Sequence, residues 1–202
     1  MFTVYSSSTT PYGRKVLVAA AEMGLSDQVT VASASGTPLD PGTMPVAQNP
    51  LGKLPVLIRP DGGALYDSRV ICRYLDQVSG AGLYPGGDAL WDVLVLEALA
   101  DGILDAALLI VYETRIRPEP LQFAPWVEGQ WAKVARALDA VEADWLPDLQ
   151  GGPTMGQIAL GCALGYLDFR MSARGWRSGH PGLAAWFDGF AQRPSMLATA
   201  PV

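Results

Sequence analysis

Four hydroxyl-bearing residues at positions 7–10 stand immediately before Pro11, at the predicted start of a helix. A helix N-terminus carries unpaired backbone N–H groups and a partial positive charge, so it stabilises an anion beside it. If that anion is a thiolate, an N-cap hydroxyl can donate to it and favour its ionisation. Thr10 occupies this position, and Thr9 and Ser7 are alternatives because successive hydroxyls leave the register open. The other interpretation is that Thr10 only caps the helix.

An acidic residue and a serine, Asp67 and Ser68, head a later amphipathic segment, where we expect Ser68 to cap the helix. A carboxylate can hold an α-amino group, whereas a hydroxyl and helix N-terminal amides can hold an α-carboxylate. Together these groups would recognise a γ-glutamyl group. The alternative is that the pair serves helix capping alone.

Pro55 opens a short apolar strand within residues 49–57. Proline cannot donate to a sheet ladder, so it belongs at an edge or beside a group that uses the neighbouring backbone. A cis bond before Pro55 would turn the Leu54 N–H and C=O outward, toward a peptide-like ligand. An ordinary trans proline at the start of an edge strand is the alternative.

The run Asn49-Pro50-Leu51-Gly52-Lys53-Leu54-Pro55-Val56-Leu57, followed by Asp67-Ser68, resembles the glutathione S-transferases. Members of that family carry a similar N-P-x-G-x-x-P-x-L run and an acidic residue–serine pair shortly after it. The resemblance extends from residues 2–5 to residues 193–196. It implies a bacterial cytosolic type with a thioredoxin-like domain, a cis proline at position 55 and a helical second domain. It also implies a homodimer.

The resemblance further implies that glutathione is the co-substrate and that its thiolate attacks a small hydrophobic electrophile, as in detoxification. Thr10 would stabilise the thiolate. The implied glutathione-binding residues are Lys53, Leu54, Pro55, Asp67 and Ser68, and Lys53 would pair with the glycyl carboxylate. Tyr12 and Tyr112 are candidates for the second-substrate site.

The chain departs from cysteine-bearing subgroups, because Thr10 stands where they have cysteine. A hydroxyl cannot form a mixed disulfide, so conjugation is expected rather than thiol transfer. Cys72 and Cys162 lie inside apolar segments and are expected to be reduced core thiols. The alternative functions are a non-catalytic binding or regulatory protein of the same fold and a thiol–disulfide oxidoreductase.

The composition describes a globular protein, since half of its 202 residues are apolar and 17% are charged. The net charge of −6 argues against nucleic acid or an anionic membrane as a partner. An anionic small ligand would need a local cationic pocket, for which the candidates are Arg14, Lys15, Lys53, Arg69 and Arg73. No secretion signal or membrane span is recognised, so a cytoplasmic location is expected.

The periodicity predicts an α/β domain over residues 1–80 with a mixed sheet. Its elements are a strand at 2–5, a helix at 11–23, a strand at 28–32, a loop at 33–49, a hairpin of 54–59 and 64–66, and a helix to 79. Thr10 and Pro11 are in the favoured order for a helix start, and Gly24 suits its C-terminal cap.

A Gly- and Pro-rich linker at residues 81–87 precedes an all-helical domain over residues 88–202, with helices at 90–112, 123–146, 154–171 and 181–191. Residues 154–157 form a capping-box pattern. Glu97, Asp101 and Asp105 recur on one helical face, which we interpret as lining a cleft or a dimer contact rather than binding metal. The single histidine, His180, is expected to cap a helix or to lie on the surface.

Overall fold

The first strand, β1 (Phe2–Ser6), occupies an inner position in a four-stranded sheet of order β2-β1-β3-β4. This computed structural model describes residues 1–201. The crossover helix α1 (Pro11–Glu22) and a 3₁₀ turn (Ser26–Gln28) lead to β2 (Val29–Ser33), which pairs parallel to β1. The hairpin of β3 (Val56–Ile58) and β4 (Ala64–Leu65) adds antiparallel strands on the other side. The predicted mixed sheet is therefore confirmed.

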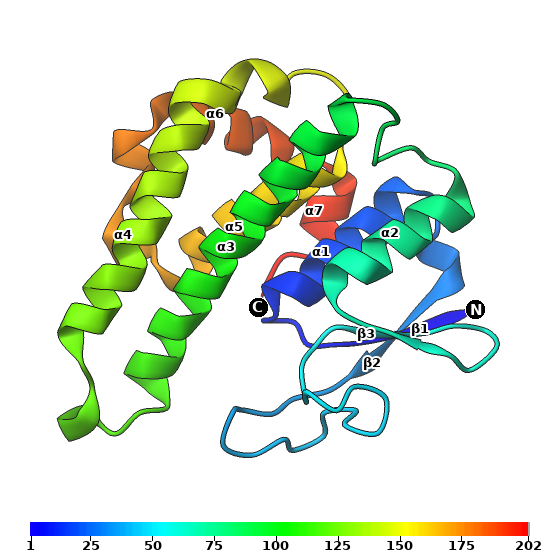
Figure 1. The fold of residues 1–202 in the computed structure, drawn as a ribbon, viewed down its shortest axis with the longest axis horizontal. Coiled ribbons are helices and arrows are strands. Elements are labelled where there is room, and N and C mark those ends of the chain that lie inside the picture. The colour runs from blue at the N-terminus through cyan, green and yellow to red at the C-terminus, as the bar shows by residue number, and fades with distance from the viewer. Residues whose placement is uncertain (202) are drawn as a thin grey trace.

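Helix α2 (Ser68–Ser79) lies beside α1 above the sheet (Figure 1). Its C-cap, Gly80, has φ +69°, a conformation that glycine adopts without steric cost. The helix start differs from the prediction in one respect. Asp67 is the N-cap and its carboxylate accepts from the Arg69 amide, whereas Ser68 is the first helical residue. A short carboxylate one residue earlier reaches the orphan amide equally well.

The second part of the chain is helical, as predicted. It comprises α3 (Ala89–Arg115), a 3₁₀ turn (Glu119–Leu121), α4 (Ala124–Ala140), a π-helical turn (Val141–Trp145), a 3₁₀ turn (Leu146–Leu149), α5 (Met155–Arg170), two further 3₁₀ turns (Ser172–Arg174 and Trp176–Gly179), α6 (Pro181–Phe190) and α7 (Pro194–Ala198). The predicted helix over 123–146 leaves α geometry at Val141, ahead of Pro147, which cannot donate a helical hydrogen bond. Helix α7 was not predicted, because it has only five residues.

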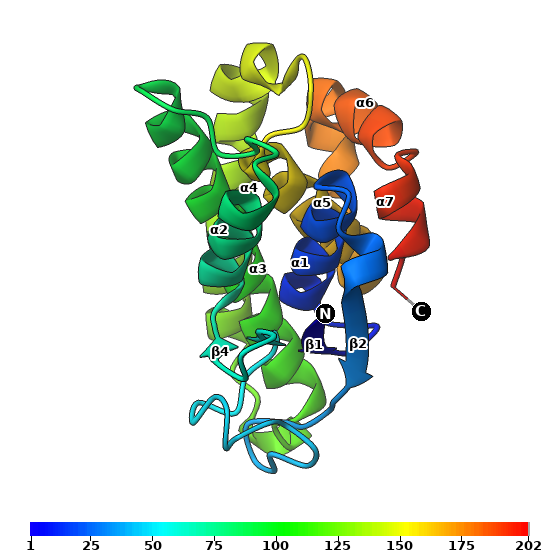
Figure 2. The ribbon, with the colours of Figure 1, turned by 90° about the vertical axis from the view of Figure 1, so that its right-hand side faces the viewer.

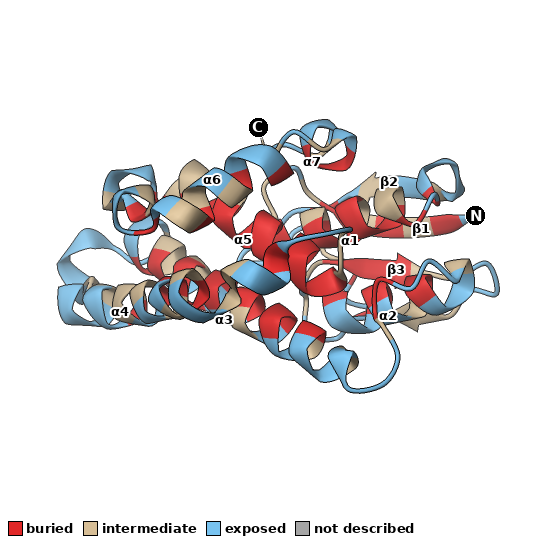
Figure 3. Ribbon diagram, turned by 90° about the horizontal axis from the view of Figure 1, so that it is seen from above, coloured by how far each residue is buried: buried red, intermediate tan, exposed pale blue. Residues whose placement is uncertain are grey.

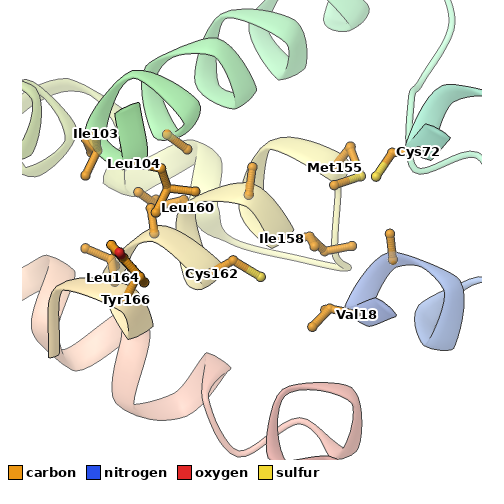
Figure 4. Close-up of a cluster of buried hydrophobic side chains, with 14 of the residues drawn as sticks. Val18, Cys72, Ile103, Leu104, Met155, Ile158, Leu160, Cys162, Leu164 and Tyr166 are labelled. Atoms are coloured by element: carbon orange, nitrogen blue, oxygen red, sulfur yellow. The ribbon is translucent and has the colours of Figure 1, made fainter. Parts of the chain in front are cut away.

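The core centres on α5, which is buried at every position from Met155 to Leu164 (Figure 3). The predicted capping box fixes its start: the Thr154 hydroxyl accepts from the Gln157 amide, and the Gln157 side chain accepts from the Thr154 amide. Helix α1 lies between α2 and α5 (Figure 2), so the first domain packs directly on the second. Figure 4 shows Val18 of α1 and Cys72 of α2 approaching the end of α5 that carries Met155 and Ile158.

Candidate functional site

Three predicted site segments lie at one end of the sheet. Strand β3 is antiparallel to both β1 and β4, so the end of β1 and the end of β4 lie beside the start of β3. Thr10 follows β1, Pro55 precedes β3 and Asp67 follows β4. The topology therefore brings together three segments that span almost sixty positions of sequence.

Thr10 is the N-cap of α1, with φ −82° and ψ 120°, and Pro11 follows as the first helical residue. Its side chain makes no capping hydrogen bond, although its carbonyl accepts from the Arg14 amide at 3.0 Å. The hydroxyl is thus not used for the capping role that the simpler interpretation gave it. The neighbouring candidates Ser7 and Thr9 are also half-buried.

Close packing holds the start of α1 against the end of β1. Ser6 is buried, and a Cβ added at Gly13 would lie 2.0 Å from the Ser6 Oγ and 2.6 Å from the Thr10 Cγ2. Both distances are far inside van der Waals contact. Only glycine at position 13 leaves room for Thr10 where it stands, a requirement that the sequence pattern did not reveal.

The Leu54–Pro55 peptide bond is cis, as predicted. Pro55 is buried, Leu54 is half-buried and Lys53 is exposed. Among residues 1–201, neither the N–H nor the C=O of Leu54 forms a hydrogen bond. An extended ligand backbone could therefore pair with Leu54 as an added strand does.

Buried Asn49 shapes the loop in front of Leu54. Its side-chain amide donates to the Lys53 carbonyl at 2.9 Å and its Oδ1 accepts from the Leu51 amide at 3.1 Å. Gly52 completes the turn with φ +58°. Asn49 thus holds Lys53 and Leu54 in place, a structural role that the motif alone did not assign.

Asp67 and Ser68 lie where α2 begins. Asp67 is exposed, and its Oδ1 accepts from the Arg69 amide at 3.0 Å. Ser68 is only 2% exposed, and no described residue hydrogen-bonds to its hydroxyl. Arg69 reaches away from this end of the helix, with its Nε 2.8 Å from the Asp101 Oδ2.

On the acidic face of α3, Glu97 and Asp101 are buried against the first domain, whereas Asp105 is exposed. Glu97 also lines a groove beside α2, which agrees with the cleft interpretation. Lys15 is completely buried, and its Nζ lies 2.8 Å from the Asp101 Oδ1 and 3.2 Å from the Glu97 Oε1. The Tyr84 hydroxyl donates to the Glu97 Oε2 at 2.9 Å. Charged residues more than eighty positions apart in the sequence thus belong to one hydrogen-bonded network.

Burial and pairing act in opposite directions in this network. Burial alone would lower the pKa of Lys15, but the carboxylates of Asp101 and Glu97 outweigh it and raise that pKa. Burial raises the pKa of Glu97, against the opposing effects of Lys15 and Tyr84. The pKa of Tyr84 is raised, chiefly by burial. The network therefore holds its protons more tightly than the same groups would in water.

The predicted cationic pocket is only partly realised. Lys15 is enclosed in the ion pair, and the Arg14 Nη2 donates to the Met196 carbonyl of α7 at 3.0 Å. The Arg73 guanidinium lies 4.4 Å from the centre of the Tyr84 ring. Lys53 remains as the exposed cation beside the Leu54 backbone.

Of the two tyrosines predicted for the second-substrate site, Tyr12 contacts the second domain, whereas Tyr112 belongs to α3 of that domain. The Tyr12 hydroxyl donates to the Asp105 carboxylate of α3, and burial followed by this bond raises the pKa of Tyr12. Tyr112 lies two turns further along α3, and burial raises its pKa. Neither hydroxyl is therefore disposed to ionise.

Both cysteines are fully buried and free, as predicted. Burial raises the pKa of the Cys162 thiol to about 11 and that of the Cys72 thiol further. A thiol that stays protonated is a poor nucleophile, which removes support from the oxidoreductase interpretation.

No group of three or more potential metal ligands occurs within residues 1–201. No helix in this part of the chain is long and apolar enough to cross a membrane.

His180 is buried, so its expected surface position is wrong. Its Nδ1 lies 2.6 Å from the Trp176 carbonyl and its Nε2 lies 2.9 Å from the Asp139 Oδ1. His180 is the N-cap residue of α6, as the capping alternative expected, but its side chain makes no capping hydrogen bond. The Glu142 carboxylate accepts from the Gly182 and Leu183 amides instead. His180 therefore has a structural role far in sequence from the candidate site.

Comparisons with known proteins match both parts of the chain. The model for the glutathione S-transferase N-terminal domain matches residues 9–78, and the model for the glutathione S-transferase C-terminal domain matches residues 124–189. YibF of Escherichia coli (strain K12), described as an uncharacterised GST-like protein, is 33% identical over 199 residues, which cover 96% of each chain.

Solved structures agree over the whole chain. A glutathione transferase family member from Pseudomonas fluorescens Pf-5, with bound glutathione, is 43% identical with a TM-score of 0.98, covering 100% of both chains. A second structure of a Pf-5 family member, with bound S-(propanoic acid)-glutathione, is also 43% identical, with a TM-score of 0.93 over 100% of both chains. A glutathione S-transferase from Methylobacillus flagellatus KT with bound glutathione is 39% identical, with a TM-score of 0.88 over 100% of both chains.

Proposed function

Because this chain belongs to the glutathione S-transferase family, we propose that it binds glutathione and conjugates the glutathione thiolate to a small, largely apolar electrophile. The observation that carries this proposal is the Thr10 hydroxyl, which stands at the start of α1 without a capping bond. A donor left free beside a helix N-terminus suits a bound anion. The glutathione-bound relatives from Pseudomonas and Methylobacillus support glutathione as the source of that anion.

The peptide part of glutathione would lie across the three segments described above. The unbonded Leu54 N–H and C=O would pair with the ligand backbone, next to Pro55. Asp67 would hold the α-amino group, and the Ser68 hydroxyl with the first amides of α2 would hold the α-carboxylate. Lys53 would pair with the glycyl carboxylate. These contacts fix the sulfur beside Thr10.

Two effects would then accelerate the reaction. Hydrogen bonding from Thr10, together with the α1 amides, lowers the pKa of the bound thiol and raises the thiolate fraction at neutral pH. Holding the thiolate next to the electrophile removes the entropic cost of bringing the two together. The electrophile would lie toward Tyr12 and Tyr112, where a carbon–sulfur bond forms and the leaving group departs with its electron pair.

We test this proposal with calorimetric glutathione binding and a chloro-dinitroarene conjugation assay. Thr10→Val keeps the side-chain shape and removes the donor, so we expect kcat to fall by about 10- to 100-fold. The conjugation rate should also rise at a higher pH than in the wild type, because the pKa of the bound thiol increases. Glutathione affinity should change by less than about threefold, since the peptide contacts remain.

Thr9→Val and Ser7→Ala are the matched controls, and each should leave kcat within about twofold if Thr10 is the donor. A large loss in either of them, with Thr10→Val unaffected, would move the role to that residue. Glutathione binding without conjugation of any probe would favour the non-catalytic alternative. Absence of glutathione binding would overturn the proposal.

We also propose that the protein is a homodimer and works in the cytoplasm, where its two free thiols stay reduced. Exposed apolar residues on the outer faces of α2 and α3 support a self-contact there, among them Val70, Val78, Trp91 and Val95. A groove of about 580 Å³ lies between the same two helices, lined in part by Val70, Arg73 and Ala98. A two-fold axis across this face would cover these residues on both copies.

A further inference from the structure

The polar face of α3 continues past its contacts with the first domain. Lys15, one turn into α1, meets Asp101, and Tyr12 in the first turn meets Asp105. Moving toward the start of α1 therefore means moving toward the end of α3, so the two helices run in opposite directions. The next polar residues on this side of α3, Tyr112 and Arg115, lie about 10 and 15 Å beyond Asp105 along the helix axis.

Residues past Asp105 consequently lie beyond the start of α1, on the side where Thr10 stands. Side chains on a helix lean toward its N-terminus, so Tyr112 and Arg115 extend back toward Asp105 and the α1 start. This is the direction in which an electrophile bound to the proposed sulfur position would extend.

Helix α5 brings a second arginine to the same region. It runs parallel to α3, because Gly156 near its start packs on Val93 and Leu96 near the start of α3. Near its end α5 carries the buried Tyr166 and the half-buried Phe169 and Arg170, and the Arg170 guanidinium carbon lies 4.0 Å from the centre of the Phe169 ring.

Tyr166 lies four residues before Arg170, on the same side of α5, and so belongs to this region. Burial raises the pKa of Tyr166, and the positive charges of Arg170 and Arg115 oppose that rise. The cluster therefore consists of aromatic rings, which suit a planar apolar group, and two guanidinium groups.

Neither arginine of the cluster pairs with a carboxylate within residues 1–201. This differs from the arginines that form ion pairs, which are Arg59, Arg69, Arg117, Arg174, Arg177 and Arg193. The Arg170 Nε, like that of Arg59, is buried without any hydrogen-bond partner among the described residues, and Arg170 has no ion pair through its other nitrogens there. Each of the two arginines ends its helix and complements the helix dipole. A dipole role explains a solvated charge but not a buried, unpartnered N–H.

We propose that Arg115 and Arg170 bind a carboxylate on the electrophile, so that the preferred second substrates are aromatic or unsaturated acids rather than neutral molecules. Guanidinium groups pair with carboxylates through strong, charge-assisted hydrogen bonds. The chain as a whole carries a net charge of −6, so such an acid would otherwise be repelled. This inference rests on the proposed function, and it specifies which electrophiles that function serves.

The test compares two probes with the same ring and leaving group, one charged and one neutral: 4-chloro-3,5-dinitrobenzoate and its methyl ester. In each reaction the thiolate attacks the chlorine-bearing carbon, the carbon–sulfur bond forms, and chloride leaves with the bonding electrons. The carboxylate takes no part in bond making. The change between wild type and variant in the ratio of kcat/KM for the acid to kcat/KM for the ester therefore reports recognition of the charge, because the intrinsic reactivities of the two probes cancel.

We expect Arg115→Gln and Arg170→Gln each to lower this ratio by about tenfold, because each removes one charge-assisted bond. The ester rate should change by less than about twofold. Arg136→Gln is the matched control: it removes an exposed α4 arginine that has no ion pair among the described residues, and it should leave the ratio unchanged. A ratio unaffected in both test variants, or lowered equally by Arg136→Gln, would overturn the inference.

A binding measurement separates this inference from the proposed function. Calorimetry with the two glutathione conjugates, acid and ester, needs no turnover. Tighter binding of the acid conjugate by the wild type, lost in Arg115→Gln and Arg170→Gln, supports the inference even if the enzyme is slow. Normal glutathione binding with no preference for the acid conjugate overturns the inference alone, whereas loss of glutathione binding overturns the proposed function as well.

Discussion

At the scale of single residues, Lys15 shows how strongly context decides the role of a charge. In the sequence it is one of several cations near a possible anion site. In the structure it is 0% exposed and held by Asp101 and Glu97 of the second domain. A buried ion pair contributes little net stability when intact, but removing one partner leaves an uncompensated buried charge. Lys15 thus links the two domains through a buried ion pair and does not contact a ligand.

Lys15→Met should lower the free energy of unfolding by about 3–5 kcal/mol at neutral pH, because Asp101 and Glu97 lose their buried partner. The wild type should also lose stability as the pH rises above the ordinary lysine pKa of 10.5, because the folded-state pKa is higher. The Lys15→Met variant should not show the loss of stability that comes from lysine deprotonation. It should still lose stability at alkaline pH through Tyr12 and Tyr84, whose pKa values are also raised by folding.

Urea unfolding at several pH values measures both effects. Lys133→Met is the control, since Lys133 is exposed on α4, and it should change stability by less than about 0.5 kcal/mol. A Lys15→Met protein as stable as the wild type would contradict the role assigned to the ion pair.

At the scale of elements, the contact between α1 and the end of β1 sets the position of Thr10. Gly13 allows this contact because a Cβ there would meet the Ser6 hydroxyl and the Thr10 methyl. A glycine inside a helix lowers its stability through conformational entropy, but here it allows α1 to pack closely against Ser6. The geometry of the proposed thiolate site depends on that approach.

Gly13→Ala should therefore lower stability by about 1–3 kcal/mol, as overpacking does, and should lower the conjugation rate further by displacing Thr10. Gly102→Ala is the opposite case. Nothing lies within 4 Å of a Cβ at Gly102 in α3, so this change should raise stability by about 0.5–1 kcal/mol. Thermal unfolding and the conjugation assay on both variants measure these effects. A stabilised, fully active Gly13→Ala protein would refute the packing argument.

Elements were predictable wherever local chemistry specifies them. Thr10 and Pro11 mark the start of α1, Gly80 ends α2, and the Thr154–Gln157 capping box opens α5. Contacts between distant residues were not predictable. The pairing of Lys15 with Asp101 spans 86 positions, and the Glu142 carboxylate that caps α6 lies 40 positions before it. A periodic pattern holds no information about such partners.

At the scale of the whole molecule, the site was predictable through its motifs but not through its surroundings. The sequence motif at residues 49–57 predicted the cis bond before Pro55, and the pair at residues 67–68 predicted the start of α2. Arg115 and Arg170, which pair with no carboxylate within residues 1–201, belong to no motif, and they share one region of the molecule only because α3 packs along α5.

The proposed homodimer also belongs to this scale. Val70→Asp places a charge on the exposed apolar face of α2, where Val70 is 47% exposed, and should shift the protein toward monomer by at least about tenfold in dissociation constant. Sedimentation velocity over a concentration series measures the shift. Leu197→Asp is the control, since Leu197 is 58% exposed on α7, and it should leave the association unchanged. A Val70→Asp protein that associates like the wild type would place the interface elsewhere.

The hydrogen bonds between α1 and the C-terminal residues around α7 have a consequence for synthesis on the ribosome. The Glu22 carboxylate accepts from Arg193, 171 positions later, and the Arg14 Nε donates to Thr199, 185 positions later. At about 5–20 residues per second, a nascent α1 waits roughly 10–35 s for these partners to be translated. During that interval the surface of α1 that the region of α7 later covers is exposed to solvent. Chaperones and proteases therefore have most access to the nascent chain at this stage.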